Sequence, residues 1–145
     1  MHDLSVVVEA IHLGAEGAPE LRPVESVTAV AGQGLEGDRH FHPEGAAPGQ
    51  ALTLVEAENV ESVGLEPGAT RRQVTVRGVD LNALVGKRFR VGEVECVGVE
   101  LCEPCTHLES MTRPGIIKEL VHRAGLNADI VTGGTIRVGD PVVEL

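Results

Sequence analysis

The chain has 145 residues with 12 basic and 22 acidic side chains, a net charge of −10, and two Phe but neither Tyr nor Trp. A chain of this length buries enough surface to fold as one domain around an aliphatic core. An acidic chain without Tyr or Trp offers neither a basic surface nor stacking platforms, which argues against nucleic acid as a partner. Since no apolar run has the length of a membrane span and no secretory leader is recognisable, we expect a cytoplasmic protein with no membrane partner.

Short runs rich in Val, Ile, Leu and Thr, separated by Gly, predict many short strands. In chain order we expect strands at residues 4–12, 24–30, 50–55, 71–77, 87–91, 93–101, 136–140 and 142–145. Loops rich in Gly and Pro are expected at residues 14–23 and 32–49. Helices are expected at residues 56–63 and 116–124. The pattern predicts a single domain, residues 1–145, that is mainly β, with a β-barrel as the favoured architecture and one or two short helices.

The loop at residues 32–49 contains the segment GLEGDRHFH. Its two glycines allow a left-handed backbone and close approach of other groups, and Asp38 and Arg39 place opposite charges at the turn. Gly37, Asp38, Arg39 and His40 are therefore candidate binding residues. The alternative is a tight turn in which Asp38 binds local N–H groups and the histidines are only solvated.

Half of the basic residues fall between residues 71 and 90, a window with a net charge of +5, while the remainder of the chain carries −15. Arg71 and Arg72 begin the window, and Arg88 and Arg90 end it. Because guanidinium groups bind phosphate or carboxylate through paired hydrogen bonds, these four arginines are candidates for an anion site. The alternative is that they are strand-edge charges that oppose aggregation.

Three cysteines lie in or just beyond the strand expected at residues 93–101. Cys96 falls within the strand and is expected to be a small core residue. Cys102 and Cys105 form a CxxC pattern beyond its end, with His107 two residues later, and a thiol in that position can face a cavity. Cys105 is the leading candidate for a working thiolate. A redox dithiol and half of a zinc site remain alternatives, although the sequence shows neither a βαβ unit nor a second CxxC.

Taken in order, four segments of the chain resemble the MOSC domain, the family named for the C-terminal domain of molybdenum cofactor sulfurases. They are GLEGDRH, RRQVTVRGVDLNALVGKRFRVGEV, CEPCTHLE and GLNADIVTGGTIRVGD, and the resemblance runs over residues 24–145. It is to the short, stand-alone bacterial type, and it implies a fold like the β-barrel domain of pyruvate kinase. One departure is Gln73, where many small members have Asn after the arginine pair.

The resemblance implies a role around the molybdenum cofactor, a pterin dithiolene (molybdopterin) that carries a phosphate. By position in the motifs, Cys105 matches the key cysteine, which ligates molybdenum or carries sulfur as a persulfide, and Cys102 matches an accessory cysteine. The segment Gly37–His40 and the pair Arg71 and Arg72 match the stretches that bind the cofactor. In some relatives the domain holds the cofactor in reductases of N-hydroxylated compounds. A redox or desulfurase partner protein would then supply electrons or sulfur.

Whether the chain is itself an enzyme is left open by its sequence. The expected ligand is a small-molecule cofactor or substrate, and no pyridoxal phosphate site is expected. His40 or His107 would be available to exchange protons near pH 7. The alternative function is a non-catalytic module that binds the cofactor or another anion, or that senses redox state through Cys102 and Cys105.

Overall fold

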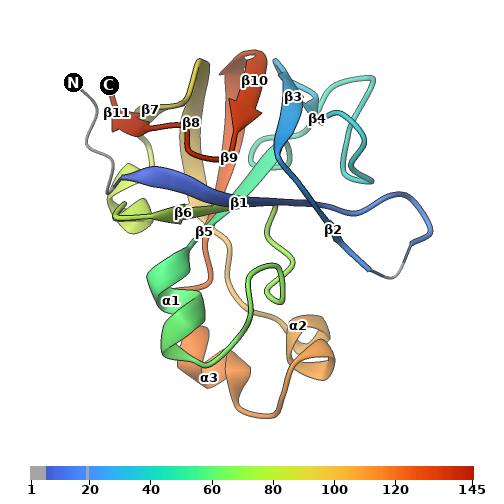
Figure 1. The fold of residues 1–145 in the computed structure, drawn as a ribbon, viewed down its shortest axis with the longest axis vertical. Helices are drawn as coiled ribbons and strands as arrows, with labels where there is room; N and C mark the ends of the chain where they lie inside the picture. Colours follow the sequence, from blue (N-terminus) through green and yellow to red (C-terminus); the bar gives the residue numbers. More distant parts are fainter. Residues whose placement is uncertain (1–5, 19) are drawn as a thin grey trace.

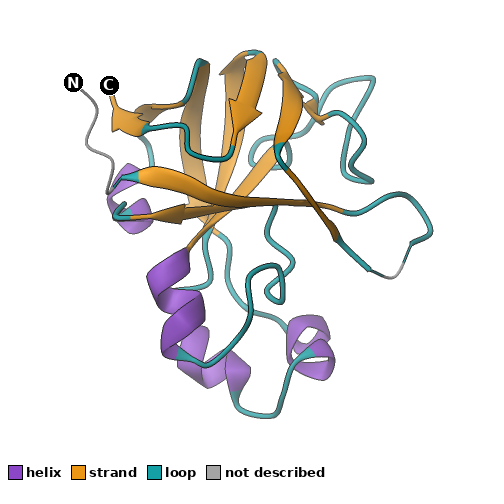
Figure 2. Ribbon diagram, viewed as in Figure 1, coloured by secondary structure: helices purple, strands orange, loops and turns teal. Residues whose placement is uncertain are grey.

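The computed structural model describes residues 6–18 and 20–145, which form strands, three α-helices and one 3₁₀ helix (Figure 1). The strands are β1 (Val7–Leu13), β2 (Arg22–Val24), β3 (Ser26–Val30), β4 (Gly34–Leu35), β5 (Leu52–Glu56), β6 (Val74–Arg77), β7 (Arg88–Val91), β8 (Val94–Leu101), β9 (Leu126–Thr132), β10 (Gly134–Arg137) and β11 (Val142–Glu144). The helices are α1 (Ala57–Ser62), α2 (Thr106–Met111) and α3 (Ile116–Leu120), and the 3₁₀ helix is Leu81–Leu84. Figure 2 shows the three α-helices gathered at one end of the β structure. No helix among these residues has the length and apolar character needed to cross a membrane.

The strands form two sheets. One has eight strands in the order β11-β7-β8-β9-β5-β6-β1-β2, and the other has the order β10-β3-β4. The described strand pairs are antiparallel except β5 with β6, which are parallel and set Leu54 opposite Val74. This parallel pair lies near the middle of the large sheet, and its neighbouring loops carry most of the candidate site residues. The prediction of a mainly β fold is confirmed.

The barrel expected from the sequence is not closed in the part of the chain that the structure describes. The link between β10 and β11 does reach β1, where the Val8 N–H donates to the carbonyl of Asp140 at 2.8 Å. Val7 and Pro141 form only an isolated bridge there. The Val142 N–H donates to the carbonyl of Val6 at 3.2 Å on the other side of this bridge, so the contact is two hydrogen bonds wide and does not extend into a full strand ladder.

Three differences from the expected elements affect the candidate site. β6 begins at Val74 and not at residue 71, because Arg71 adopts a left-handed backbone with φ of +63°. α2 was not predicted and begins directly after Cys105, which raises the number of α-helices to three in the described residues. The last predicted helix ends at Leu120 and not at residue 124, since the next residue already has an extended ψ of 129°.

Two clusters of buried side chains stabilise the fold. The main cluster fills the space between the two sheets with aliphatic side chains from both, together with Phe89 and Cys96, each 0% exposed. A second cluster lies under the helices and consists of Val63, Leu108, Ile116, Leu120 and Ala124. Since Leu108 belongs to α2, this cluster fixes the helix that follows Cys105. The predicted core position of Cys96 is confirmed.

Raising the pH above 9 is expected to destabilise the protein through Cys96. Burial raises the pKa of this thiol from 9.0 to about 12, so the unfolded chain loses the proton before the folded chain does. Above pH 9 the free energy of unfolding should therefore fall by about 1.4 kcal/mol per pH unit from this group. Denaturant titrations of the native chain and of Cys96→Ala at several pH values test this. In Cys96→Ala the free energy of unfolding should fall less steeply with pH above pH 9. Equal slopes in the two proteins would contradict the assignment of this pH dependence to Cys96.

Candidate functional site

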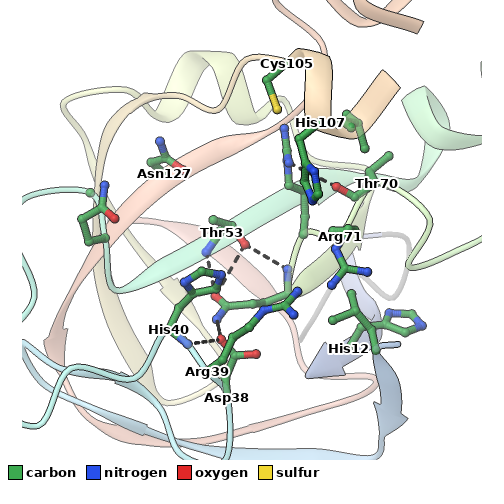
Figure 3. Close-up of a pocket in the computed structure, with 16 residues that line it drawn as sticks. His12, Asp38, Arg39, His40, Thr53, Thr70, Arg71, Cys105, His107 and Asn127 are labelled. Atoms are coloured by element: carbon green, nitrogen blue, oxygen red, sulfur yellow. Dashed lines mark hydrogen bonds between the residues drawn. The ribbon is translucent and has the colours of Figure 1, made fainter. Parts of the chain in front are cut away.

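A cavity of about 450 Å³ lies beside the β5–β6 pair, between the loop after β4 and the start of α2 (Figure 3). Its volume falls within the range of small-molecule sites. Seven of the residues predicted from the sequence line it: Asp38, Arg39, His40, Arg71, Arg72, Cys105 and His107. The structure therefore brings together three segments that are far apart in the sequence.

Four predicted residues do not line this cavity. Gly37 is exposed next to Asp38 and has a φ of +87°, which favours glycine. Cys102 is half-buried and is not among the residues that line the cavity. Arg88 and Arg90 were expected to join the anion site, and the structure does not bring them there. They lie on β7, which β8 and β9 separate from β5 in the sheet, and Arg88 instead pairs with Glu95 of β8.

Asp38 anchors the loop that forms one wall of the cavity. Its carboxylate is 8% exposed and accepts hydrogen bonds from Gly14 N–H at 2.9 Å, His40 N–H at 3.0 Å and Gln73 Nε2 at 2.8 Å. The other end of the Gln73 amide accepts from Thr53 N–H at 3.0 Å, and Gln73 N–H donates to Thr53 Oγ1 at 2.9 Å. This network fixes the loop to the first residues of β5 and to the residue before β6.

Arg39 and Arg71 place two guanidinium groups in the same half-buried space, and Figure 3 shows both side chains directed into the cavity. Burial lowers the pKa of Arg71, and the positive charge of Arg39 lowers it further. Two cations that repel each other in a partly desolvated cavity create a site where a bound anion is favourable. The left-handed backbone of Arg71 stores strain of about 1 kcal/mol, as is common at ligand-binding positions.

Cys105 is exposed at the boundary between the loop after β8 and α2, with its sulfur near the cavity (Figure 3). Cys102 is half-buried, and burial raises the pKa of its thiol, while the nearby Arg72 guanidinium acts in the opposite direction. Both thiols are free, and they are three residues apart in the chain. The exposed thiol of this pair is thus the one that lines the cavity.

Arg72 lines the cavity next to Arg71 but directs its hydrogen bonds to the protein backbone. Nε donates to the carbonyl of Ala124 at 2.8 Å, Nη1 to that of Thr70 at 3.1 Å, and Nη2 to those of Cys102 and Glu103 at 3.2 and 3.3 Å. This use of the side chain differs from the phosphate contact that its place in the motif implies.

Sequence reasoning missed several polar residues of the cavity, among them His12 and Thr70. His12 Nδ1 and Thr70 Oγ1 are buried and have no hydrogen-bond partner in the described structure. Burial lowers the pKa of His12, which favours the neutral imidazole at pH 7. His12 stands inside a strand-like run and Thr70 in a turn, so neither has a sequence pattern that indicates a site.

The cavity contains no ready-made metal cage. Within the described residues, no group of three or more His, Cys, Asp or Glu side chains could hold a metal ion. The soft donor it offers is the thiol of Cys105, and its cationic groups come from arginine. Such a donor set suits an anionic ligand that brings its own metal or sulfur.

The comparisons with known proteins agree with the fold described above. A family model described as the MOSC domain matches residues 36–143. The structure is similar to that of the YuaD protein from Bacillus subtilis, with a TM-score of 0.78, 17% identity, and coverage of 94% of this chain and 93% of that one. It is also similar to YiiM from Geobacillus stearothermophilus, with a TM-score of 0.72, 19% identity, and coverage of 97% and 75%. No curated protein matches the sequence.

Proposed function

The chain belongs to the MOSC domain family, and on that premise we propose that its cavity binds a molybdenum cofactor, with Cys105 as a sulfur ligand or sulfur carrier. One observation carries the proposal: the exposed thiol of Cys105 and the guanidinium groups of Arg39 and Arg71, which come from distant segments, line a single cavity of about 450 Å³. This combination matches a ligand with a phosphate at one end and a metal or sulfur centre at the other.

The residues present fit such a cofactor. Arg39 and Arg71 offer charge-assisted hydrogen bonds to a phosphate, and their mutual repulsion would be relieved by a bound anion. Cys105 offers a soft thiolate ligand. His12 and Thr70 carry buried polar atoms without partners at the cavity wall, as expected where a ligand or water completes the hydrogen bonding. When bound, the cofactor would supply two-electron chemistry or accept sulfur.

The side chains of the cavity divide the work around the ligand. Arg39 and Arg71 hold the phosphate and orient the ligand toward Cys105. His40 and His107 lie at the exposed edge of the cavity, where each imidazole can donate or accept a hydrogen bond to a bound ligand. In the sulfur-carrier role, the Cys105 thiolate attacks the outer sulfur of a donor persulfide. The sulfur–sulfur bond of the donor breaks, the donor leaves as a thiolate, and Cys105 becomes a persulfide.

The same arrangement supports a finer proposal about partners and substrates. A desulfurase partner would supply the donor persulfide, or a redox partner would supply electrons for the reduction of an N-hydroxylated compound. Two free thiols in a CxxC pattern, Cys102 and Cys105, also favour a second candidate function, a non-catalytic module that senses oxidants by forming a disulfide. Bound molybdenum without turnover, together with a disulfide after mild oxidation, would favour that second function.

The cofactor proposal is tested by the metal content of the protein produced in a host that makes the cofactor and purified without oxygen. The native chain is expected to retain molybdenum and phosphorus, and Arg71→Gln to retain about 10-fold less or lower still, since a lost hydrogen bond to a charged group weakens binding by that order. Arg90→Gln removes the same charge on β7, away from the cavity, and should match the native chain. Native protein without molybdenum and phosphorus, or equal losses in both variants, would overturn the proposal.

A further inference from the structure

Arg71 and Arg72 are adjacent in the sequence but are used differently in the structure. The Arg72 guanidinium binds backbone carbonyls of three segments: its own turn at Thr70, the loop at Cys102 and Glu103, and Ala124 just before β9. In sequence, Cys102 and Glu103 lie 30 and 31 residues from Arg72, and Ala124 lies 52 residues from it. One side chain therefore connects the cysteine loop to the central sheet.

These bonds leave little of Arg72 for an anion. A phosphate is bound bidentately by two parallel N–H groups along one edge of a guanidinium. In Arg72 the Nε, Nη1 and Nη2 atoms each already donate to a carbonyl, and Nη2 donates to two. The guanidinium edge formed by Nε and Nη2 and the edge formed by Nη1 and Nη2 both donate to the backbone, so neither edge is left for a phosphate.

We propose that Arg72 is a positioning residue that holds the loop of Cys102–Cys105 in place, while anion binding is left to Arg39 and Arg71. The inference deepens the proposed function and rests on it, because it takes Cys105 as the working thiol. It also departs from the sequence-based expectation that both arginines of the pair contact the cofactor.

The cysteine loop depends on a few anchors. On one side the Cys102 N–H donates to the carbonyl of Gly125 at 2.8 Å. At its exposed side the Glu103 carboxylate accepts from the His122 N–H at 2.7 Å. Arg72 supplies a further anchor through the carbonyls of Cys102 and Glu103, and it lines the cavity. Without Arg72, the carbonyls of Cys102 and Glu103 lose their bonds to the segment just before β6, and the segment before Cys105 is held only at its other contacts.

Site-resolved alkylation tests the role of Arg72 without any cofactor. Iodoacetamide labelling from pH 6 to pH 10, followed by peptide mass spectrometry, gives separate rates for the three thiols. In Arg72→Ala the half-buried Cys102 is expected to react about 10- to 100-fold faster than in the native chain, because the charge-assisted bonds that keep the loop closed are gone. Its pH profile should shift toward that of an ordinary thiol. Methylguanidinium at millimolar concentration should restore protection, and sodium chloride should not.

The fully buried Cys96 reports whether the fold is intact in each variant. If Cys96 also becomes reactive in Arg72→Ala, the test moves to Arg72→Lys, whose single ammonium should give an intermediate Cys102 rate with Cys96 protected. Unchanged Cys102 protection in Arg72→Ala, or exposure that methylguanidinium fails to reverse while Cys96 stays protected, would overturn the inference. Arg90→Gln should behave as the native chain in every arm.

Binding of inorganic phosphate separates the two arginines. Arg71→Gln is expected to weaken phosphate binding about 10-fold and to keep Cys102 protected, whereas Arg72→Ala should change phosphate affinity less than about threefold and expose Cys102. The inference would be overturned if Arg72→Ala weakened phosphate binding about 10-fold while Arg71→Gln exposed Cys102. The proposed function fails separately, through absence of molybdenum from the native protein, and that result leaves the alkylation pattern as it is.

Discussion

Replacing Cys105 with serine is expected to abolish the sulfur chemistry of the cavity while the fold stays intact. The thiol is exposed, so its loss creates no cavity in the core. A serine hydroxyl is neither a soft metal ligand nor a thiolate nucleophile at neutral pH, so a sulfane sulfur cannot be carried there. We expect reductase or sulfur-transfer activity, and cyanide-releasable sulfur, to fall by at least about 100-fold. The thermal unfolding midpoint should stay close to that of the native chain.

Cys102→Ser is the matched control for this experiment. It makes the same chemical change three residues away, at a half-buried thiol that does not line the cavity. We expect it to retain most of the activity and of the releasable sulfur. Full retention in Cys105→Ser would remove Cys105 from the proposed function, and equal losses in both variants would instead favour the dithiol function.

The mainly β fold could be predicted because its strands alternate in a simple way. β9 (Leu126–Thr132) follows the same rule, since Leu126, Ala128 and Ile130 are buried, but it was not predicted because Asn127 and Asp129 between them are residue types that are rare in strands. α2 (Thr106–Met111) was out of reach for a different reason. A six-residue helix is not stable by propensity alone, and this one depends on Leu108 packing in the second core cluster.

The candidate site was predictable where its residues share a motif and unpredictable where tertiary geometry decides. Arg88 and Arg90 were grouped with Arg71 because they are close along the chain, yet the order of strands in the sheet separates them. Arg71 and Arg72 look equivalent in sequence. The left-handed backbone at Arg71 and the carbonyls around Arg72 give them different surroundings, and neither feature can be read from neighbouring letters.

Gln73 shows how a departure from the expected motif gains meaning in the structure. Its amide reaches Asp38 with one end and Thr53 with the other, while its backbone N–H returns to the same threonine. A side chain shorter by one methylene would not span both partners from this backbone position. The loop that carries Arg39 and His40 is therefore held by a glutamine at position 73. In this loop the buried Asp38 carboxylate is the central hydrogen-bond acceptor.

Replacing Asp38 with alanine is accordingly expected to lower the free energy of unfolding by about 3 kcal/mol. The change leaves the N–H groups of Gly14 and His40 and the amide of Gln73 without their acceptor in a buried place. Asp38→Asn should cost less, about 1–2 kcal/mol, because its one oxygen still serves two donors while its NH₂ opposes the third. Urea titrations of both variants give these values directly.

Asp38→Ala should also weaken phosphate binding, because Arg39 follows Asp38 directly and its position depends on the loop that the Asp38 carboxylate holds. Glu36→Ala provides the control, since it removes an exposed acid two residues earlier and should change stability by less than about 0.5 kcal/mol. If removing negative charge from the loop were the dominant effect, both alanine variants would strengthen phosphate binding. If the anchoring role dominates, Asp38→Ala weakens it and Glu36→Ala does not. An Asp38→Ala protein with the stability and phosphate affinity of Glu36→Ala would contradict the anchoring role.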